Sequence, residues 1–320
     1  MKHTDLLKRS AIAAALLLTA GLANAQLAYV PNERSGTISI LDTKTDSVIG
    51  EFAAGDKPRG LVASADKKTL FVSDQPNNAL LVVDLEKQAV TKTIDLGESP
   101  EGVGITKDGK ILATAIEEDN AVFFFDATTT EKLFEVTTDG ENPEHVVFSP
   151  DGKWAYVSAE ESQVVDVIDV QAQKHHGTIK VGKRPRGIAF TPDGKFAYVA
   201  CEVAHTVFAI DVATHSVIAS IPGGQRSNGV EMHPSGKEVY ISNGKDHTVI
   251  AIDVATNKVT HTIEVGKRPW NMAMTPDGGK LYVANGRSGT VSIIDTATKK
   301  KLDDVTVGKF PWGVLIPDAE

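Results

Sequence analysis

The amino-acid sequence predicts an all-β fold built from seven equivalent units. Each unit has four short β-rich runs separated by turns that contain Gly, Pro, Asp or Thr, and helical periodicity is absent. The units recur every 42 residues, with one interval of 43. They are marked by Asp42, Asp84, Asp126, Asp169, Asp211, Asp253 and Asp295. Four strands in about 42 residues is typical of a propeller blade, so we expect a seven-bladed β-propeller with four antiparallel strands per blade.

The unit that ends near residue 221 shows the order of these elements. Its predicted strands cover residues 187–190, 196–200, 206–210 and 217–221. Pro192-Asp193-Gly194 forms the turn between the first two strands, because Pro presets φ, Gly accepts positive φ and Asp can bond nearby backbone amides. The turn between the last two strands starts at Asp211.

The two ends of the chain are predicted to share one blade. Ala28-Tyr29-Val30 has the pattern of a second strand with no first strand before it. Residues 310–316 have the pattern of a first strand with nothing after it. In this 3+1 arrangement the C-terminal strand pairs with the three N-terminal strands, so that the ring closes and few strand edges stay exposed.

Residues 1–25 are predicted to be a secretory signal peptide, followed by a single domain over residues 26–320. Lys2, Lys8 and Arg9 precede a short apolar run and a small-residue cleavage segment. The run of about ten residues is too short to span a membrane. We therefore expect a soluble, monomeric protein in the periplasm.

The charge balance limits the classes of partner, and the cysteine content excludes an intramolecular disulfide. The chain has 33 basic and 42 acidic residues, and without the signal peptide these become 30 and 41, a net charge of -11. This charge disfavours indiscriminate binding to nucleic acid or to anionic membranes. Cys201 is the single cysteine, so no intramolecular disulfide can form.

Tyrosine-containing motifs recur in the predicted second strands. They are Tyr29-Val30-Pro31-Asn32, Tyr156-Val157, Tyr198-Val199-Ala200, Tyr240-Ile241-Ser242-Asn243 and Tyr282-Val283-Ala284-Asn285. With these motifs, nearly the whole mature chain resembles the YVTN-repeat β-propeller family. It most resembles the β-propeller proteins associated with pyrroloquinoline quinone (PQQ)-dependent alcohol catabolism and, more distantly, the YncE-like periplasmic propellers. The resemblance implies an accessory role in PQQ-dependent alcohol oxidation, with PQQ as a candidate cofactor.

A basic and aromatic group of residues is predicted at the mouth of the channel, where the loops before the first strands and those between the second and third strands meet. This basic crescent consists of Arg59, Arg186, Arg226, Asn228, Arg268, Trp270, Arg287 and Trp312. Guanidinium groups pair with carboxylate or phosphate, and Trp rings stack on planar groups. Arg and Trp are also enriched in protein interfaces. The crescent thus predicts a small anionic ligand or a protein partner, and solvated loop charges are the alternative.

An acidic group of residues is predicted on the neighbouring blades. This acidic sector consists of Glu101, Glu117, Glu144, His145 and Glu160. Carboxylate oxygens suit Ca²⁺, but no calcium-loop spacing is present, and solvated carboxylates are the alternative. We therefore assign no metal ligand and no catalytic residue.

These features favour an exported, non-enzymatic binding or docking protein. The sequence contains no haem-attachment, nucleophile-elbow, HExxH or phosphate-loop motif. Two alternatives stay open. One is a metal-dependent, lactonase-like hydrolase that uses the acidic sector. The other is a propeller that binds single-stranded nucleic acid by stacking bases on Trp, which the net charge disfavours.

Overall fold

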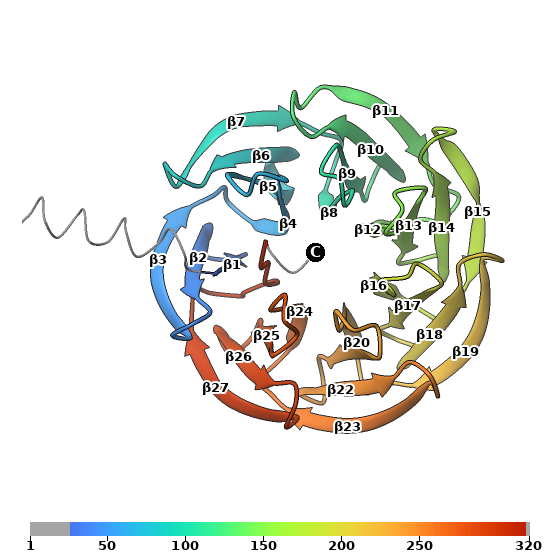
Figure 1. Cartoon of the computed structure of the whole chain (residues 1–320). Coiled ribbons are helices and arrows are strands. Elements are labelled where there is room, and N and C mark those ends of the chain that lie inside the picture. Colours follow the sequence, from blue (N-terminus) through green and yellow to red (C-terminus); the bar gives the residue numbers. More distant parts are fainter. Residues whose placement is uncertain (1–25, 318–320) are drawn as a thin grey trace, which may run out of the picture.

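The computed structural model describes residues 26–317, and the predicted signal peptide lies outside this range. The described residues form seven small antiparallel sheets around a central channel (Figure 1). The one helical element among them is a 3-10 turn, η1 (Gln75–Asn77). The predicted all-β, seven-bladed propeller with four antiparallel strands per blade is confirmed.

Six blades follow one another along the chain, each with its first strand at the channel and its fourth strand outside (Figure 1). The first blade contains β4 (Pro58–Ala63), β5 (Thr69–Asp74), β6 (Ala79–Asp84) and β7 (Ala89–Asp95). The second contains β8 (Pro100–Ile105), β9 (Ile111–Ile116), β10 (Ala121–Asp126) and β11 (Lys132–Thr137). The third contains β12 (Pro143–Phe148), β13 (Trp154–Ala159), β14 (Val164–Asp169) and β15 (Lys174–Lys180).

The second half of the ring repeats this order. The fourth blade contains β16 (Pro185–Phe190), β17 (Phe196–Cys201), β18 (Thr206–Asp211) and β19 (Ser216–Pro222). The fifth contains β20 (Ser227–Met232), β21 (Glu238–Asn243), β22 (Thr248–Asp253) and β23 (Lys258–Glu264). The sixth contains β24 (Pro269–Met274), β25 (Lys280–Asn285), β26 (Thr290–Asp295) and β27 (Lys300–Thr306).

The closing blade joins the two ends of the chain. It contains β1 (Leu27–Asn32), β2 (Thr37–Asp42) and β3 (Ser47–Ala53), and the C-terminal segment pairs with β1. Tyr29 and Leu315 exchange two backbone hydrogen bonds of 2.8 and 2.9 Å, and the Trp312 amide donates to the Pro31 carbonyl at 2.9 Å. The predicted 3+1 closure is therefore present.

Tyrosines of the second strands connect neighbouring blades. The Tyr198 hydroxyl is buried and donates to Asn257 Oδ1 at 2.7 Å, in the turn between the third and fourth strands of the next blade. Three further tyrosines make the equivalent contact. These contacts are Tyr156 with His215, Tyr240 with Lys299, and Tyr282 with Asp46. Each buried hydroxyl is thereby satisfied and holds two blades together.

These contacts divide the ring into two arcs. We define the tyrosine-linked arc as the four blade interfaces from the third blade to the closing blade, which contain the contacts. The other three interfaces form the unlinked arc. There Phe71 and Ala113 occupy the tyrosine position of β5 and β9, and the Tyr29 hydroxyl has no hydrogen bond within the described residues.

Candidate functional site at the upper channel mouth

A bulge in each first strand directs side chains into the channel. In β16 the pairing with β17 skips from Pro185 to Ile188, so Arg186 does not pair with a residue of β17. The other five first strands have a bulge at the same point. The first bulged residues form an inner ring at the end of the channel that we call the upper mouth. With the equivalent residue of the closing blade they are Arg59, Glu101, Glu144, Arg186, Asn228, Trp270 and Trp312.

The residue after each second strand contributes to a second, outer ring. Its members are Glu33, Gln75, Glu117, Glu160, Glu202, Gly244 and Gly286. The two glycines make room for large neighbours. A Cβ at Gly286 would lie 2.8 Å from the Trp270 ring, and one at Gly244 would lie 3.1 Å from Arg268 Nη1. The outer ring thus supplies four carboxylates on one side and space for Trp270 and Arg268 on the other.

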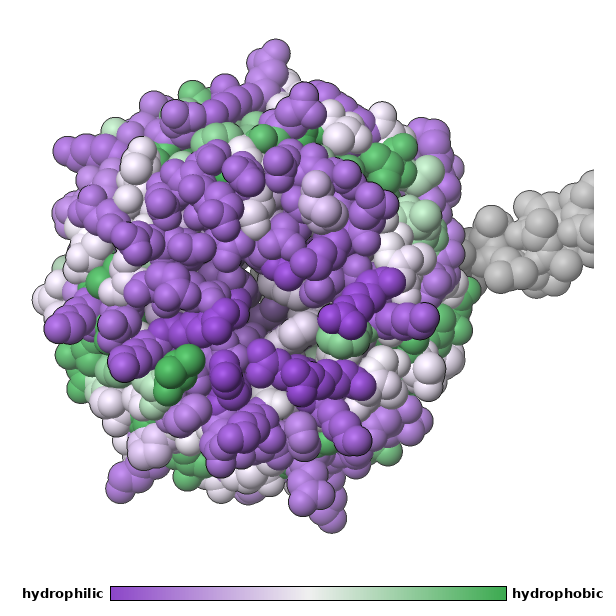
Figure 2. All heavy atoms as spheres, turned by 180° about the vertical axis from the view of Figure 1, so that it is seen from behind, coloured by the Kyte–Doolittle hydropathy of each residue, from purple (hydrophilic) through white to green (hydrophobic). Residues whose placement is uncertain are grey.

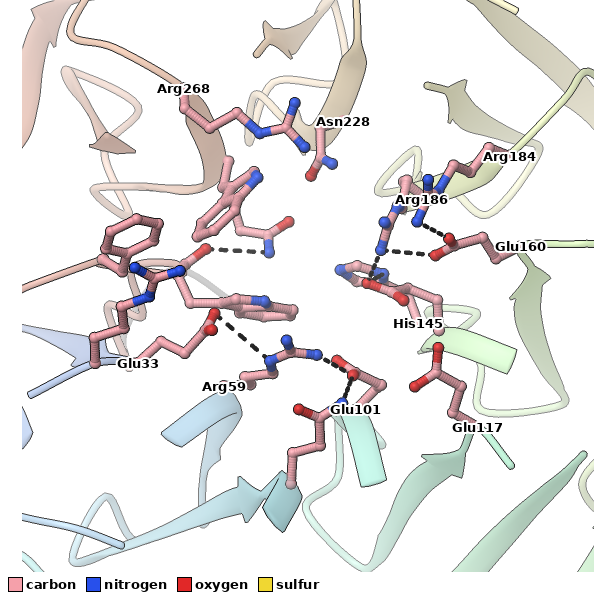
Figure 3. Close-up of a pocket in the computed structure, with 17 residues that line it drawn as sticks. Glu33, Arg59, Glu101, Glu117, His145, Glu160, Arg184, Arg186, Asn228 and Arg268 are labelled. Atoms are coloured by element: carbon pink, nitrogen blue, oxygen red, sulfur yellow. Dashed lines mark hydrogen bonds and ion pairs between the residues drawn. The ribbon is translucent and has the colours of Figure 1, made fainter. Parts of the chain in front are cut away.

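The two rings surround an upper cavity with a volume of about 360 Å³ (Figure 3). All predicted site residues except Arg226 and Arg287 line it. Arg226 contacts a carboxylate beside the cavity, and Arg287 is exposed on the same face. Hydrophilic side chains surround a central hollow on this face (Figure 2). The cavity is also lined by Glu33, Arg34, Gln75, Arg184, Asn271 and Phe310.

The basic crescent and the acidic sector form one network and not two separate surfaces. The Arg186 guanidinium contacts Glu144 and lies 2.9 Å from Glu160 Oε2, and Arg59 contacts Glu101 (Figure 3). These side chains are long enough to reach across neighbouring blades. Most of the arginines therefore already have a carboxylate partner.

Glu202 is the carboxylate with the most partners, and the sequence analysis did not select it. Its side chain is 1 % exposed and lies within 3.3 Å of four arginines. The shortest of these contacts joins Arg268 Nη2 to Glu202 Oε1 at 2.8 Å. The four arginines are Arg184, Arg186, Arg226 and Arg268. Arg184 and Arg186 also contact Glu160, whereas Arg226 and Arg268 share one Glu202 oxygen, so these two guanidinium groups keep N–H donors that Glu202 does not satisfy.

The buried carboxylates differ in their proton affinity. Burial and the neighbouring Glu144 charge raise the pKa of Glu101 to about 8. Burial also raises the pKa of Glu160 to about 7. Burial opposes ionisation of Glu144 too, but the neighbouring groups, Arg186 foremost among them, together outweigh it and lower the Glu144 pKa to about 2. Glu101 therefore holds its proton more strongly than the neighbouring Glu144 does.

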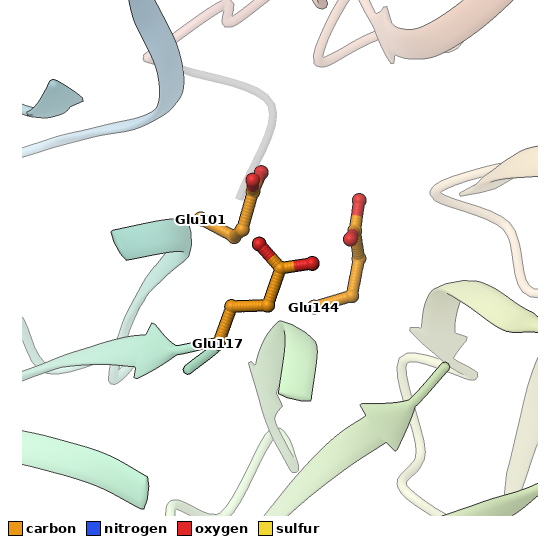
Figure 4. A group of neighbouring side chains, drawn as sticks. All are labelled: Glu101, Glu117 and Glu144. Atoms are coloured by element: carbon orange, nitrogen blue, oxygen red, sulfur yellow. The ribbon is translucent and has the colours of Figure 1, made fainter. Parts of the chain in front are cut away.

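Three carboxylates of the acidic sector come together on the second and third blades (Figure 4). One oxygen from each of Glu101, Glu117 and Glu144 lies within 4.8 Å of the others. Glu101 Oε2 is buried and has no hydrogen-bond partner among the described residues. Oxygen donors of this kind suit a hard cation such as Ca²⁺, so these residues are the ones that could hold a metal ion.

An aromatic stack forms part of the lining of the upper cavity. The second bulged residue is glycine in five blades, but it is His145 in β12 and Asn271 in β24. A Cβ at Gly102 would lie 2.6 Å from the Glu144 carbonyl oxygen, so the first strands pack tightly here. The His145 ring stacks on Trp312 from the closing blade, with centroids 5.5 Å apart. Trp312 and His145 thus line the cavity together.

Comparison with known proteins agrees with the propeller fold. A family model described as "Lactonase, 7-bladed beta-propeller" matches residues 171–307. No match is found among curated proteins. Within residues 26–317, no helix has the length and apolar character that a membrane span requires.

Three solved structures are similar to this chain. Hydrazine synthase of Kuenenia stuttgartiensis is 24% identical with a TM-score of 0.72, covering 82% of this chain and 90% of that one. A functionally unknown protein from Desulfotomaculum acetoxidans is 15% identical with a TM-score of 0.80, covering 91% and 99%. Dihydro-heme d1 dehydrogenase NirN in complex with DHE is 14% identical with a TM-score of 0.68, covering 92% and 76%. At these low identities, the structural similarity shows a common fold alone.

Proposed function

We propose that this chain is an exported, non-enzymatic binding protein that holds a planar anionic ligand in the upper cavity. The observation that carries the proposal is the sharing of Glu202 by four arginines. This arrangement leaves excess positive charge and free N–H donors on one wall of the cavity. A ligand carboxylate or phosphate would supply the missing acceptors.

The same wall offers an aromatic surface. Trp270 is half-buried, and the Arg268 guanidinium carbon lies 5.7 Å from the centroid of its ring. Burial, together with the charges of Arg186 and Arg226, lowers the pKa of Arg268. An anion bound at this point would relieve that repulsion while its ring stacks on the indole. A planar ligand with several carboxylates combines both properties.

We propose PQQ as the ligand and the periplasm as the compartment. PQQ is flat and anionic, which matches the wall formed by Arg268 and Trp270, with the charge of Arg226 beside it. The tyrosine-containing repeats support the same choice, because they resemble those of propellers associated with PQQ-dependent alcohol catabolism. The protein would then act as an accessory to alcohol oxidation.

The test is a titration of PQQ into the mature protein, followed by calorimetry and tryptophan fluorescence. We expect binding at one site, which the double variant R226Q/R268Q weakens by at least about tenfold, because the contact to Arg268 and the nearby positive charge of Arg226 are both lost. R287Q is the matched control, since Arg287 lies on the same face outside the cavity. Equal binding by both variants contradicts the proposed wall. Absence of PQQ binding would direct the search to the acidic loop of a protein partner.

A second candidate function is a metal-dependent lactonase-like hydrolase. It is favoured by the match of residues 171–307 to a lactonase family model and by the Glu101, Glu117 and Glu144 group. A hydrolase of this kind should cleave simple lactones when Ca²⁺ or Mn²⁺ is added. E117Q should abolish the activity, whereas E161Q, which changes an exposed neighbour, should retain it. Lactones left intact by the metal-supplemented protein would exclude this function.

A further inference from the structure

A second cavity of different chemistry lies at the opposite ends of the first strands from the upper cavity. This lower cavity has a volume of about 460 Å³ and is lined by the lower halves of β4, β8, β12, β16 and β20. Its apolar lining includes Val103, Val146, Phe148, Ile188, Phe190 and Met232. The upper cavity is lined mainly by charged residues, so the two ends of the channel suit different molecules.

The polar groups of the lower cavity are few, and most have partners. Glu231 Oε1 accepts a hydrogen bond from the Met274 amide at 3.1 Å. The Ser149 hydroxyl donates to Asp151 at 2.6 Å. Lys107 is exposed and also lines the cavity, and no ion pair or side-chain hydrogen bond of Lys107 is found within residues 26–317. It is therefore the positive charge that a ligand at this end would meet.

Lys107 departs from the repeat at this position. It lies in the turn between β8 and β9, where the corresponding turns of the third, fourth and fifth blades have Pro150, Pro192 and Pro234. These three prolines line the same cavity. Proline is the residue that favours this type of turn, so the lysine is not required by the turn itself. It adds a charge to the rim of an apolar cavity.

We propose that the lower cavity binds a small amphiphile with an aliphatic chain and one anionic head group, such as a medium-chain carboxylate. The chain lies against the partly exposed Val147, Ala189 and Met232, and the head group pairs with Lys107. Burial of the chain provides most of the affinity, because each methylene removed from water is favourable. The solvent-exposed ion pair provides a smaller part and selects for an anion. This site is separate from the proposed PQQ site.

The first test compares chain lengths with the mature protein. Hexanoate, octanoate and decanoate are titrated by calorimetry, with 1-octanol as the neutral analogue. We expect saturable binding at one site, with affinity that rises about fourfold per methylene. Affinity that does not depend on chain length, or no binding of decanoate, overturns the proposal.

The second test assigns the binding to the lower cavity. K107P restores the residue of the other blades and should weaken octanoate binding about two- to fivefold without affecting 1-octanol. K195Q is its control, because Lys195 lies in an equivalent turn but outside the cavity. A189F, which fills the cavity from β16, should abolish binding of both ligands. R226Q/R268Q should bind octanoate normally, and loss of octanoate binding in that variant would place the ligand in the upper cavity and refute the proposal.

Discussion

The two arcs of the ring differ in how closely they follow the repeat. The tyrosine-linked arc has a buried tyrosine contact at each of its four interfaces, and most of it lies within the 171–307 segment that matches the propeller family model. The unlinked arc lacks these contacts. It supplies Glu101 and Glu117, and Glu144 lies at its border with the third blade. The less regular arc thus carries the unusual carboxylate chemistry, while the regular arc supplies the arginine wall.

Removing the strand that closes the ring should cause the largest loss of stability, and it should affect both arcs. A chain without residues 310–320 loses the backbone bonds to β1 and the buried side chains of Trp312, Leu315 and Ile316. Burial of three such side chains predicts a loss of more than about 5 kcal/mol in the free energy of unfolding. Urea unfolding measures this loss, and a truncated protein with the midpoint of the full chain would show that the 3+1 closure is not needed.

The stability of the unlinked arc should depend on pH through Glu101. Its pKa is about 8 in the folded protein and near 4.3 in an unfolded chain. Between these values only the folded state holds the proton, so stability decreases as pH rises. This contribution reaches up to about 1.4 kcal/mol per pH unit.

Glu101→Gln removes this contribution. Measured by urea unfolding at pH 5, 6, 7 and 8, the variant should become more stable relative to the wild type as pH rises. Glu118→Gln, at an exposed position of the same blade, should follow the wild type. Parallel pH curves for Glu101→Gln and the wild type would mean that Glu101 is ionised throughout.

The tyrosine-linked arc should depend on Glu202. In Glu202→Gln, four arginines lose a shared counter-charge, and Arg186 is itself 14 % exposed. Breaking a buried ion pair from one side predicts a loss of about 3 kcal/mol. Asp193→Asn, which breaks an exposed pair with Lys195, should cost much less. Equal thermal unfolding midpoints for the Glu202→Gln and Asp193→Asn variants would show that Glu202 does not stabilise the network.

The smallest expected loss of stability comes from removing one of the tyrosine contacts that define the arcs. Tyr198→Phe should cost about 1 kcal/mol, because it leaves Asn257 without its hydroxyl partner. Tyr29→Phe should be close to neutral, since that hydroxyl has no partner within the described residues. Urea unfolding of the two variants side by side is the measurement. Equal losses would remove the distinction between the arcs.

The sequence predicts the architecture well because the repeat determines it locally. The 42-residue interval, the Pro and Gly turns, and the incomplete blades at both ends are sufficient for the fold and its closure. The same alignment brings most of the upper-cavity residues together, because each follows a loop proline, as Arg59 and Trp270 do. No sequence motif that repeats between the blades predicts the 3-10 turn after β5.

The ion pairs could not be predicted in the same way. Arg59 and Glu101 are 42 residues apart, and their contact depends on side chains that cross between blades. Glu202 could have been found by comparing the residue after each second strand, where Glu33, Glu117 and Glu160 also occur. The stacking of His145 on Trp312 requires two opposite blades, so it emerges only when the ring is closed.

The calorimetric titration of PQQ into the mature wild-type, R226Q/R268Q and R287Q proteins tests the central claim most directly. We predict one binding site in the wild type and in R287Q, with an affinity at least about tenfold lower in R226Q/R268Q. Identical binding curves for the three proteins, or no binding to any of them, would contradict the assignment of the upper cavity as a PQQ site.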